Sequence, residues 1–232
     1  MKNIVNVIKI ATVAYAFLLS GLSSAGVASI FDDPYLVTVE TGGNIIGYYA
    51  SENDRFSCTF LFMGNLNKIK NEPSSNFNIL NIKTFNIDFY ASHYRYSQRD
   101  KNWDIPGNLF IRGNELILKT EAPHGGCNSV AGLFNGGPGD AGVVQYSKRK
   151  KINAIGIGVV NKKTFFFDKA GSEKRKGFLV VGNIVVILSR RSDYSYVRFT
   201  NPSFMISNPG ETTMGWIKTN DLEDPFPPSQ KQ

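Results

Sequence analysis

The residues best suited to chemistry in this chain are His124 and Cys127, which stand three positions apart in the stretch EAPHGGCNSV at 121–130. The chain has two histidines and two cysteines, so this stretch holds one of each pair. A cysteine thiolate is a strong nucleophile when a histidine beside it removes the thiol proton. The same cysteine could instead bond to Cys58, which would leave no thiol to react. The pair therefore poses a choice between a thiol enzyme and a structural bridge.

Two families of exported cell-wall enzymes use a catalytic cysteine, and the chain departs from both. The run PHGGC at 123–127 loosely resembles the histidine–glycine–cysteine run of L,D-transpeptidases, but it has one glycine more and a proline where that family has a hydroxyl residue. NlpC-type peptidases place their cysteine at the start of a helix, whereas Cys58 stands in the strand-like pattern FSCTF. A helix start lowers the pKa of a thiol, and a strand does not. We therefore expect no catalytic residues and keep the thiol enzyme as an alternative.

Cys58 and Cys127 are expected to form a disulfide. Residues 1–25 predict export, as described in the next paragraph. Exported proteins mature in an oxidising compartment, where two cysteines are normally bonded to each other. Chain-entropy reasoning gives such a bridge, between residues 69 positions apart, a stabilisation of about 4 kcal/mol. The two histidines are separated by 31 positions and no carboxylates cluster near them, so we expect neither a metal site nor a cofactor.

Residues 1–25 have the three-part plan of a secretory signal peptide. Lys2 and Lys9 precede an apolar stretch at 10–19, and small residues follow it. That stretch is far shorter than the ~20 residues needed to span a bilayer. We expect cleavage, a periplasmic or extracellular location, and no integral membrane segment in the mature chain.

The basic character of the chain is mild and does not predict nucleic-acid binding. Its net charge of +7 includes the two lysines of the signal peptide. The densest basic run, SKRKK at 147–151, lies between two strand-like stretches, and we interpret it as a solvated hairpin tip. A nucleic-acid site would need a more concentrated basic stripe.

Strand patterns dominate the mature chain, and helix patterns are nearly absent. Short aromatic and β-branched runs alternate in polarity and end at Gly, Asn or Pro, for example YLVTVE at 35–40 and NLFIRGNELILKT at 108–120. Segments this short and regular favour an all-β sandwich or barrel. We predict an all-β chain in which residues 30–160 form a disulfide-closed β-sandwich or barrel of unidentified family. The Pro-rich residues 223–232 are predicted to be a disordered tail.

One polar connection, residues 93–107, mixes aromatic and basic side chains. Tyr94 and Trp103 stand there among arginines and a lysine. Aromatic side chains beside arginines suit contact with a partner, which makes these two residues candidates for binding. The alternative is a plain surface connection, because long loops vary freely.

Residues 163–222 contain four short motifs: FLVVG at 178–182, VVIL at 185–188, YVRF at 196–199, and GWI at 215–217 closing on Asp221-Leu222. Through these motifs the segment resembles the bacterial Src-homology-3-like (SH3-like) domain found in many exported proteins. The chain departs from the family at Asn183, where an acid often follows the turn glycine, and in the aromatic pair Tyr194 and Tyr196 of the distal strand. The resemblance implies a small barrel, with Trp216 on its last strand, that binds cell-wall peptides or protein segments.

The sequence thus predicts an exported, non-enzymatic binding protein that recognises a cell-wall peptide or another exported protein through its SH3-like domain. The contact residues expected in that domain are Tyr194, Tyr196, Trp216 and Phe204, the last on the loop at 202–211. An inhibitor or immunity protein is the first alternative, because a rigid β scaffold with aromatic loops can fill the cleft of a secreted wall-degrading enzyme. A cysteine-dependent cell-wall-modifying enzyme is the second alternative.

Overall fold

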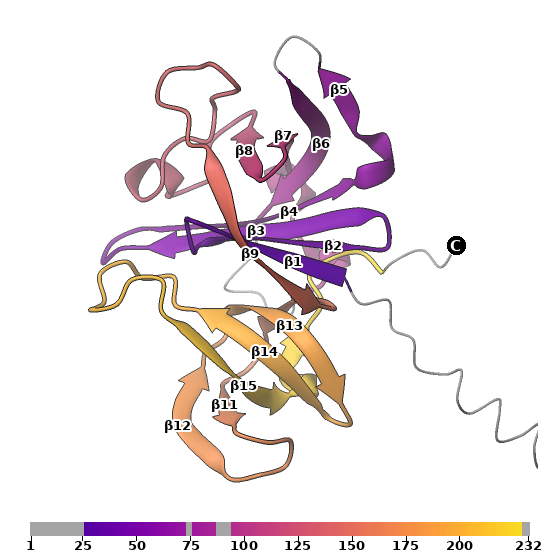
Figure 1. Ribbon diagram of the computed structural model, residues 1–232. Helices are drawn as coiled ribbons and strands as arrows, with labels where there is room; N and C mark the ends of the chain where they lie inside the picture. The colour runs from indigo at the N-terminus through magenta and orange to yellow at the C-terminus, as the bar shows by residue number, and fades with distance from the viewer. Residues whose placement is uncertain (1–25, 73–75, 87–93, 229–232) are drawn as a thin grey trace, which may run out of the picture.

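The computed structural model describes residues 26–72, 76–86 and 94–228. These residues form two antiparallel sheets (Figure 1). The predicted signal peptide and His93 lie outside the described residues. The helical segments among the described residues are short 3-10 turns, at Leu66–Lys68 (η1), Tyr96–Gln98 (η2), Lys101–Trp103 (η3), Cys127–Ser129 (η4) and Thr219–Asp221 (η5). Within the described ranges, no helix has the length and hydropathy needed to cross a membrane.

The first sheet is a closed barrel of eight strands, with β5 as a ninth strand attached to β6. Each barrel strand pairs with the next one in the chain, β4 pairs with β6 across the β5 excursion, and β9 returns to pair with β1. Closure of this kind leaves the barrel strands without a free edge. The strands are β1 (Gly26–Phe31), β2 (Leu36–Thr41), β3 (Asn44–Glu52), β4 (Ser57–Asn65), β5 (Lys70–Glu72), β6 (Phe77–Phe85), β7 (Ile105–Arg112), β8 (Glu115–Thr120) and β9 (Tyr146–Ala154).

Large apolar side chains fill the barrel. One cluster of buried residues includes Phe60, Phe62, Leu80 and Leu109, each 0% exposed. Gly47 makes room for this filling, because a Cβ built on it would lie 2.2 Å from the ring of Phe62. The interior is therefore a packed core, as expected for the narrowest barrels.

The second sheet is a curled half-barrel of seven strands in the order β12-β11-β15-β14-β13-β10-β16. Its inner face holds a small core that includes Phe166, Val185, Val197 and Ile217. The strands are β10 (Gly156–Val160), β11 (Thr164–Phe167), β12 (Lys174–Leu179), β13 (Ile184–Arg191), β14 (Tyr194–Thr200), β15 (Thr212–Lys218) and β16 (Leu222–Glu223).

The two sheets share one hydrophobic cluster where the half-barrel packs on the outside of the barrel. Ile157 and Val186 of the second sheet belong to the same buried cluster as Val37 and Tyr48 of the barrel. Phe226, which follows the last strand, is 6% exposed and joins the cluster from the C-terminal side. Burial raises the pKa of Tyr48 to about 12, because the phenolate would lose its hydration at this interface.

The prediction of an all-β chain with an N-terminal barrel and a disulfide is confirmed. Three local features differ from expectation. The run at 147–151 lies inside β9, paired with β1, and is not a hairpin tip. The strand at 156–160, which we had placed in the N-terminal domain, pairs with β13 and β16 of the second sheet. The predicted disordered tail is described as far as residue 228, with Phe226 buried.

Candidate binding surface

Strands β14 and β15 place three of the predicted contact residues on one face of the second sheet. Side chains alternate along a strand, so residues two apart share a face. Val197 and Ile217 point into the half-barrel core. Tyr194, Tyr196 and Trp216 therefore lie on the opposite, outer face, and each is partly exposed.

These three side chains touch one another or a common neighbour. Tyr196 is directly opposite Trp216 in the β14–β15 register, and their ring centroids are 5.3 Å apart. On the other side of β15, Trp216 pairs with Phe167 of β11. The ring of Phe167 packs edge-on against Tyr194 at 5.4 Å. The structure thus brings the predicted residues together around an aromatic side chain that the sequence analysis did not select.

The aromatic surface continues across β11 to the edge strand β12. Phe165 and Phe178 face each other in the register, with ring centroids 6.1 Å apart. The ammonium of Lys163 lies 4.1 Å from the centroid of the Phe178 ring, and that of Lys174 lies 4.9 Å from the centroid of the Phe165 ring. Phe178 is 49% exposed, so this end of the surface is the most open to solvent.

We call this surface the aromatic row. It crosses four strands and consists of Tyr194, Tyr196, Trp216, Phe167, Phe165 and Phe178, with Lys163 and Lys174 at its open end. Aromatic rings on a rigid sheet offer contact area at low entropic cost, and the lysines favour a partner that carries negative charge. The arrangement is suited to recognition of a peptide or a protein surface.

Phe204 lies apart from the aromatic row. Its backbone N–H donates to the carbonyl of Glu52 in β3 at 3.2 Å, and Ser203 forms an isolated bridge with the same residue. The side chain of Phe204 is partly buried, while that of Met205 is 57% exposed. The loop at 202–211 therefore rests against the barrel, and Met205 is its exposed apolar residue.

Trp103 stands on the barrel side of the molecule and is 64% exposed. The loop that carries it is held by Arg99, whose guanidinium donates to both carboxylate oxygens of Asp104 at 2.9 and 2.7 Å. The same guanidinium lies 3.6 Å from the centroid of the Tyr96 ring. Asp100 caps the short turn by accepting from the Asn102 N–H at 2.9 Å. Trp103 is thus an exposed ring on a well-fixed turn.

Tyr94 is not available to a partner, contrary to the prediction. It is 6% exposed and packs in the cluster between the two sheets. Its backbone N–H donates to the carboxylate of Glu223 in β16. The residue fastens the 94–104 loop to the second sheet, so the aromatic surface of that loop is provided by Trp103.

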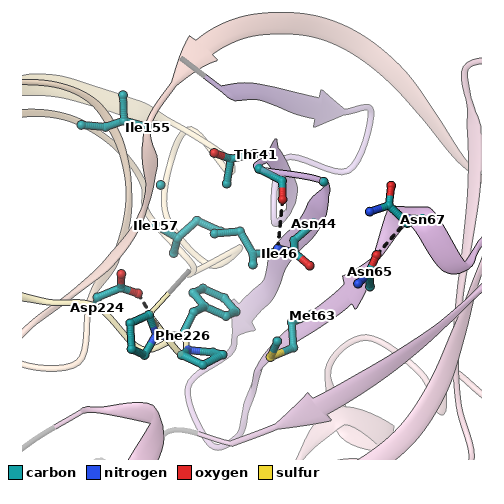
Figure 2. A pocket seen from close by; sticks show the side chains of 15 residues that line it. Thr41, Asn44, Ile46, Met63, Asn65, Asn67, Ile155, Ile157, Asp224 and Phe226 are labelled. Carbon is teal, nitrogen blue, oxygen red and sulfur yellow. Dashed lines mark hydrogen bonds between the residues drawn. The ribbon is translucent and has the colours of Figure 1, made fainter. Parts of the chain in front are cut away.

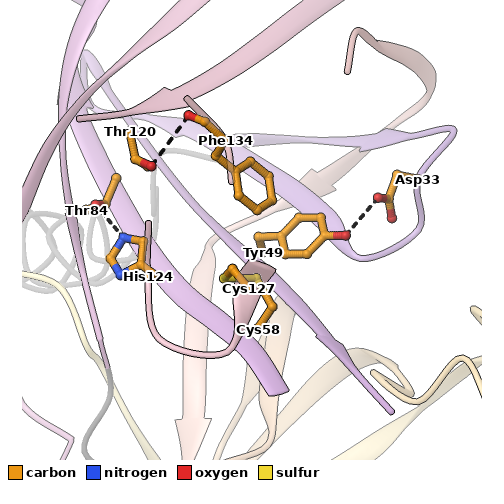
Figure 3. Close-up of a disulfide and its surroundings, with 8 residues drawn as sticks. All are labelled: Asp33, Tyr49, Cys58, Thr84, Thr120, His124, Cys127 and Phe134. Atoms are coloured by element: carbon orange, nitrogen blue, oxygen red, sulfur yellow. Dashed lines mark hydrogen bonds between the residues drawn. A yellow bond between two sulfur atoms is a disulfide. The ribbon is translucent and has the colours of Figure 1, made fainter. Parts of the chain in front are cut away.

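Cys58 and Cys127 form the predicted disulfide, with an S–S distance of 2.01 Å (Figure 3). The bridge joins β4 to η4, in the connection between β8 and β9. That connection covers one end of the barrel, where the Phe134 ring lies 5.0 Å from Tyr49 and 5.3 Å from Phe60. Because each sulfur is bonded to the other, neither is a thiolate in this structure.

His124 is a buried packing residue in this arrangement. It is 3% exposed and stacks on Phe60 with ring centroids 4.3 Å apart. Its Nε2 lies 2.7 Å from Oγ1 of Thr84, and that hydroxyl donates its hydrogen to the carbonyl of Ile105 at 2.8 Å. Nε2 must then be the donor, which leaves Nδ1 buried, unprotonated and without a hydrogen-bond partner among the described residues.

The surroundings of His124 favour its neutral form. Burial lowers the pKa of the imidazole to about 4, because the charged form would lose its hydration. Thr84, its hydrogen-bond partner, is 0% exposed. Within the described ranges, no group of three or more His, Cys, Asp or Glu side chains is placed to hold a metal ion.

Comparison of the chain with protein-family models, with curated proteins and with solved structures gave no significant match.

Proposed function

We propose that this protein is an exported, non-enzymatic binding protein that recognises a cell-wall peptide or an exported protein through the aromatic row of its second sheet. The observation that carries the proposal is the row itself: six aromatic side chains in mutual contact or register across four strands, with two lysines at the open end. Phe178 is 49% exposed, Phe165, Tyr194, Tyr196 and Trp216 are partly exposed, and Phe167 is buried beneath them. Clustered aromatic side chains that reach solvent mark interaction sites in soluble proteins.

Within this proposal the SH3-like resemblance stays a prediction for the second sheet, in which residues 163–222 contribute β11 to β16. β10 pairs with β13 on one side and with β16 on the other, so the last strand lies beside the first after the short turn η5. The disulfide supports export, since such bonds persist in oxidising compartments.

The inhibitor or immunity function is a second candidate because of Trp103. A single exposed ring on a turn fixed by the Arg99–Asp104 ion pair suits insertion into the cleft of an enzyme. The Trp103 turn and the aromatic row belong to different parts of the molecule, so variants can separate the two candidates. The cysteine-dependent enzyme would require reduction of the Cys58–Cys127 bond before either sulfur could react.

The test uses the mature chain with its disulfide intact, in pelleting assays with purified peptidoglycan and in binding assays with secreted wall hydrolases. We expect Phe178→Ala and Trp216→Ala each to weaken binding to peptidoglycan or to its protein partner about tenfold or more, as for aromatic anchor residues of interfaces. Trp103→Ala is the matched control. Phe178 is half-exposed, so Phe178→Ala should keep the fold intact. This variant therefore tests the proposal even if Trp216→Ala does not fold.

The reciprocal result would favour the inhibitor. In that case Trp103→Ala would abolish binding to a hydrolase, and Phe178→Ala would bind as the wild type does. Wild-type affinity of both aromatic-row variants for every ligand that the chain binds would overturn the proposal.

A further inference from the structure

The structure contains a concave surface that is separate from the aromatic row. It is a cleft of about 620 Å³ at the junction of the two sheets (Figure 2). This volume is in the range of ~300–1,000 Å³ that small-molecule sites occupy. The cleft is bounded by the β2–β3 turn and the end of β4 on the barrel, and by the β9–β10 connection and the C-terminal segment on the other side.

One wall of the cleft is rich in side-chain amides. Asn44, Asn65 and Asn67 line it together with the hydroxyl-bearing Thr41. Asn44 donates to the carbonyl of Gly42 at 3.3 Å, and Oδ1 of Asn65 accepts from the Asn67 N–H at 2.9 Å. The remaining amide groups of these side chains, including both of Asn67, have no hydrogen-bond partner in the part of the chain that the structure describes.

The local sequence explains why this wall is open. The β2–β3 hairpin turns through Gly42 and Gly43, both with positive φ, at 55° and 74°. Two-residue turns of this kind require such angles at both positions, and glycine adopts them without strain. A Cβ built on Gly43 would lie 3.3 Å from the amide nitrogen of Asn67. Because neither glycine has a side chain, the turn leaves space for the Asn67 amide at the entrance of the cleft.

The opposite wall is apolar. Figure 2 shows Ile155, Ile157 and Phe226 across the cleft from Asn65 and Asn67. Pro227 and Pro228 extend this wall towards solvent. One carboxylate, Asp224, lines the cleft, and its Oδ1 accepts from the Phe226 N–H at 2.9 Å. None of the lining residues carries a positive charge.

We propose that the cleft binds a neutral saccharide. An anionic ligand would lose its hydration without meeting a cation in the wall, and a wholly apolar ligand would leave the amides unpaired. A sugar ring satisfies both walls, because its hydroxyls pair with amides that donate and accept, and its C–H face lies on apolar side chains. The inference is independent of the aromatic row and of the function proposed for it.

The test is an NMR titration of the ¹⁵N-labelled mature chain with three neutral or charged probes. These are the N-acetylglucosamine tetramer, cellotetraose and the anionic tetragalacturonate. We expect at least one neutral tetrasaccharide to bind at millimolar concentration or below and to shift the side-chain amide signals of Asn65 and Asn67. Tetragalacturonate should bind more weakly than the neutral probe.

Asn44→Ala and Asn67→Ala should each weaken the binding of the neutral tetrasaccharide about fivefold, the loss expected for one neutral hydrogen bond. Asn67 is exposed and Asn44 partly exposed, so the melting temperature should stay close to that of the wild type. Asn208→Ala is the matched control, because Asn208 is an exposed asparagine outside the cleft.

Three results would overturn the proposal. The first is no binding of either neutral tetrasaccharide at millimolar concentration. The second is binding that Asn44→Ala and Asn67→Ala leave unchanged. The third is binding of a capped tetra-alanine peptide, with loss in the same variants, while both saccharides fail to bind. That result would assign the amide wall to a peptide backbone.

Discussion

At the scale of single residues, His124 has a side chain whose chemistry suits catalysis, but its burial makes it a packing residue. Its ring is stacked on Phe60 and its Nε2 is bonded to Thr84 inside the capped end of the barrel. A histidine that must stay neutral in the folded state binds its proton more readily after unfolding. The residue therefore links the stability of the fold to pH.

The sign and size of this linkage can be predicted. The pKa of His124 is about 4 in the folded chain, against an ordinary value of 6.5. Its contribution to stability is therefore full above pH 6.5 and is lost as the pH falls towards 4. Between pH 7 and pH 5 the loss should be about 2 kcal/mol. Urea unfolding of the wild type and of His124→Gln at both pH values measures it, and the variant should lack this part of the pH dependence.

An independent measurement uses NMR. In a His93→Gln background a single imidazole signal remains, and it should titrate with a pKa near 4. Titration near 6.5, together with equal pH dependence of wild type and His124→Gln, would contradict the burial of a neutral ring.

At the scale of elements, the connection between β8 and β9 depends on one glycine. Gly126 has φ 79°, and a Cβ built on it would lie 2.1 Å from the carbonyl oxygen of Ser57. A Cβ built in the same way on the neighbouring Gly125 would have no other atom within 4 Å. Close approach of the two backbones beside the disulfide is therefore possible at position 126 because glycine has no side chain.

Gly126→Ala should accordingly destabilise the protein by about 2 kcal/mol or more, through a left-handed backbone angle and the clash with β4. Gly125→Ala is the matched control and should change stability by no more than about 0.5 kcal/mol. Urea unfolding with the disulfide intact measures both. Equal stabilities of the two variants would show that the connection does not rest on Ser57 as described.

Sequence patterns predicted the strands, the disulfide and part of the candidate binding surface, and the residues that they missed were missed for physical reasons. Tyr194, Tyr196 and Trp216 were selected from the motifs of the SH3-like resemblance, and alternation along β14 and β15 places them on one face. Phe165 and Phe167 were missed because the run TFFF shows no alternation, and their partners in β12 are shifted by a bulge. The burial of Tyr94 depends on where the second sheet packs, which local sequence does not specify.

At the scale of the whole molecule, the described residues of the two sheets share a hydrophobic cluster at their junction. Ile184 and Val186 of β13 pack in it with Val39 and Leu61 of the barrel, and Phe226 contacts Phe85 at a centroid distance of 5.8 Å. If one sheet unfolded alone, the apolar side chains that the other sheet contributes to this cluster would be exposed to water, and the free energy of their burial would be lost. The barrel and the half-barrel are therefore expected to depend on each other for stability.

This coupling predicts a single cooperative unfolding transition. The two tryptophans lie on opposite sides of the junction, so Trp103→Phe leaves Trp216 as a fluorescent reporter of the second sheet alone. Trp103 is exposed, and its replacement should not disturb the fold. Far-UV circular dichroism reports the strands of both sheets. The urea midpoints of fluorescence and dichroism should coincide, because separate unfolding of the half-barrel would expose Val186 and Val39 to water. Two resolved midpoints would mean that the cluster between the sheets contributes too little to couple them.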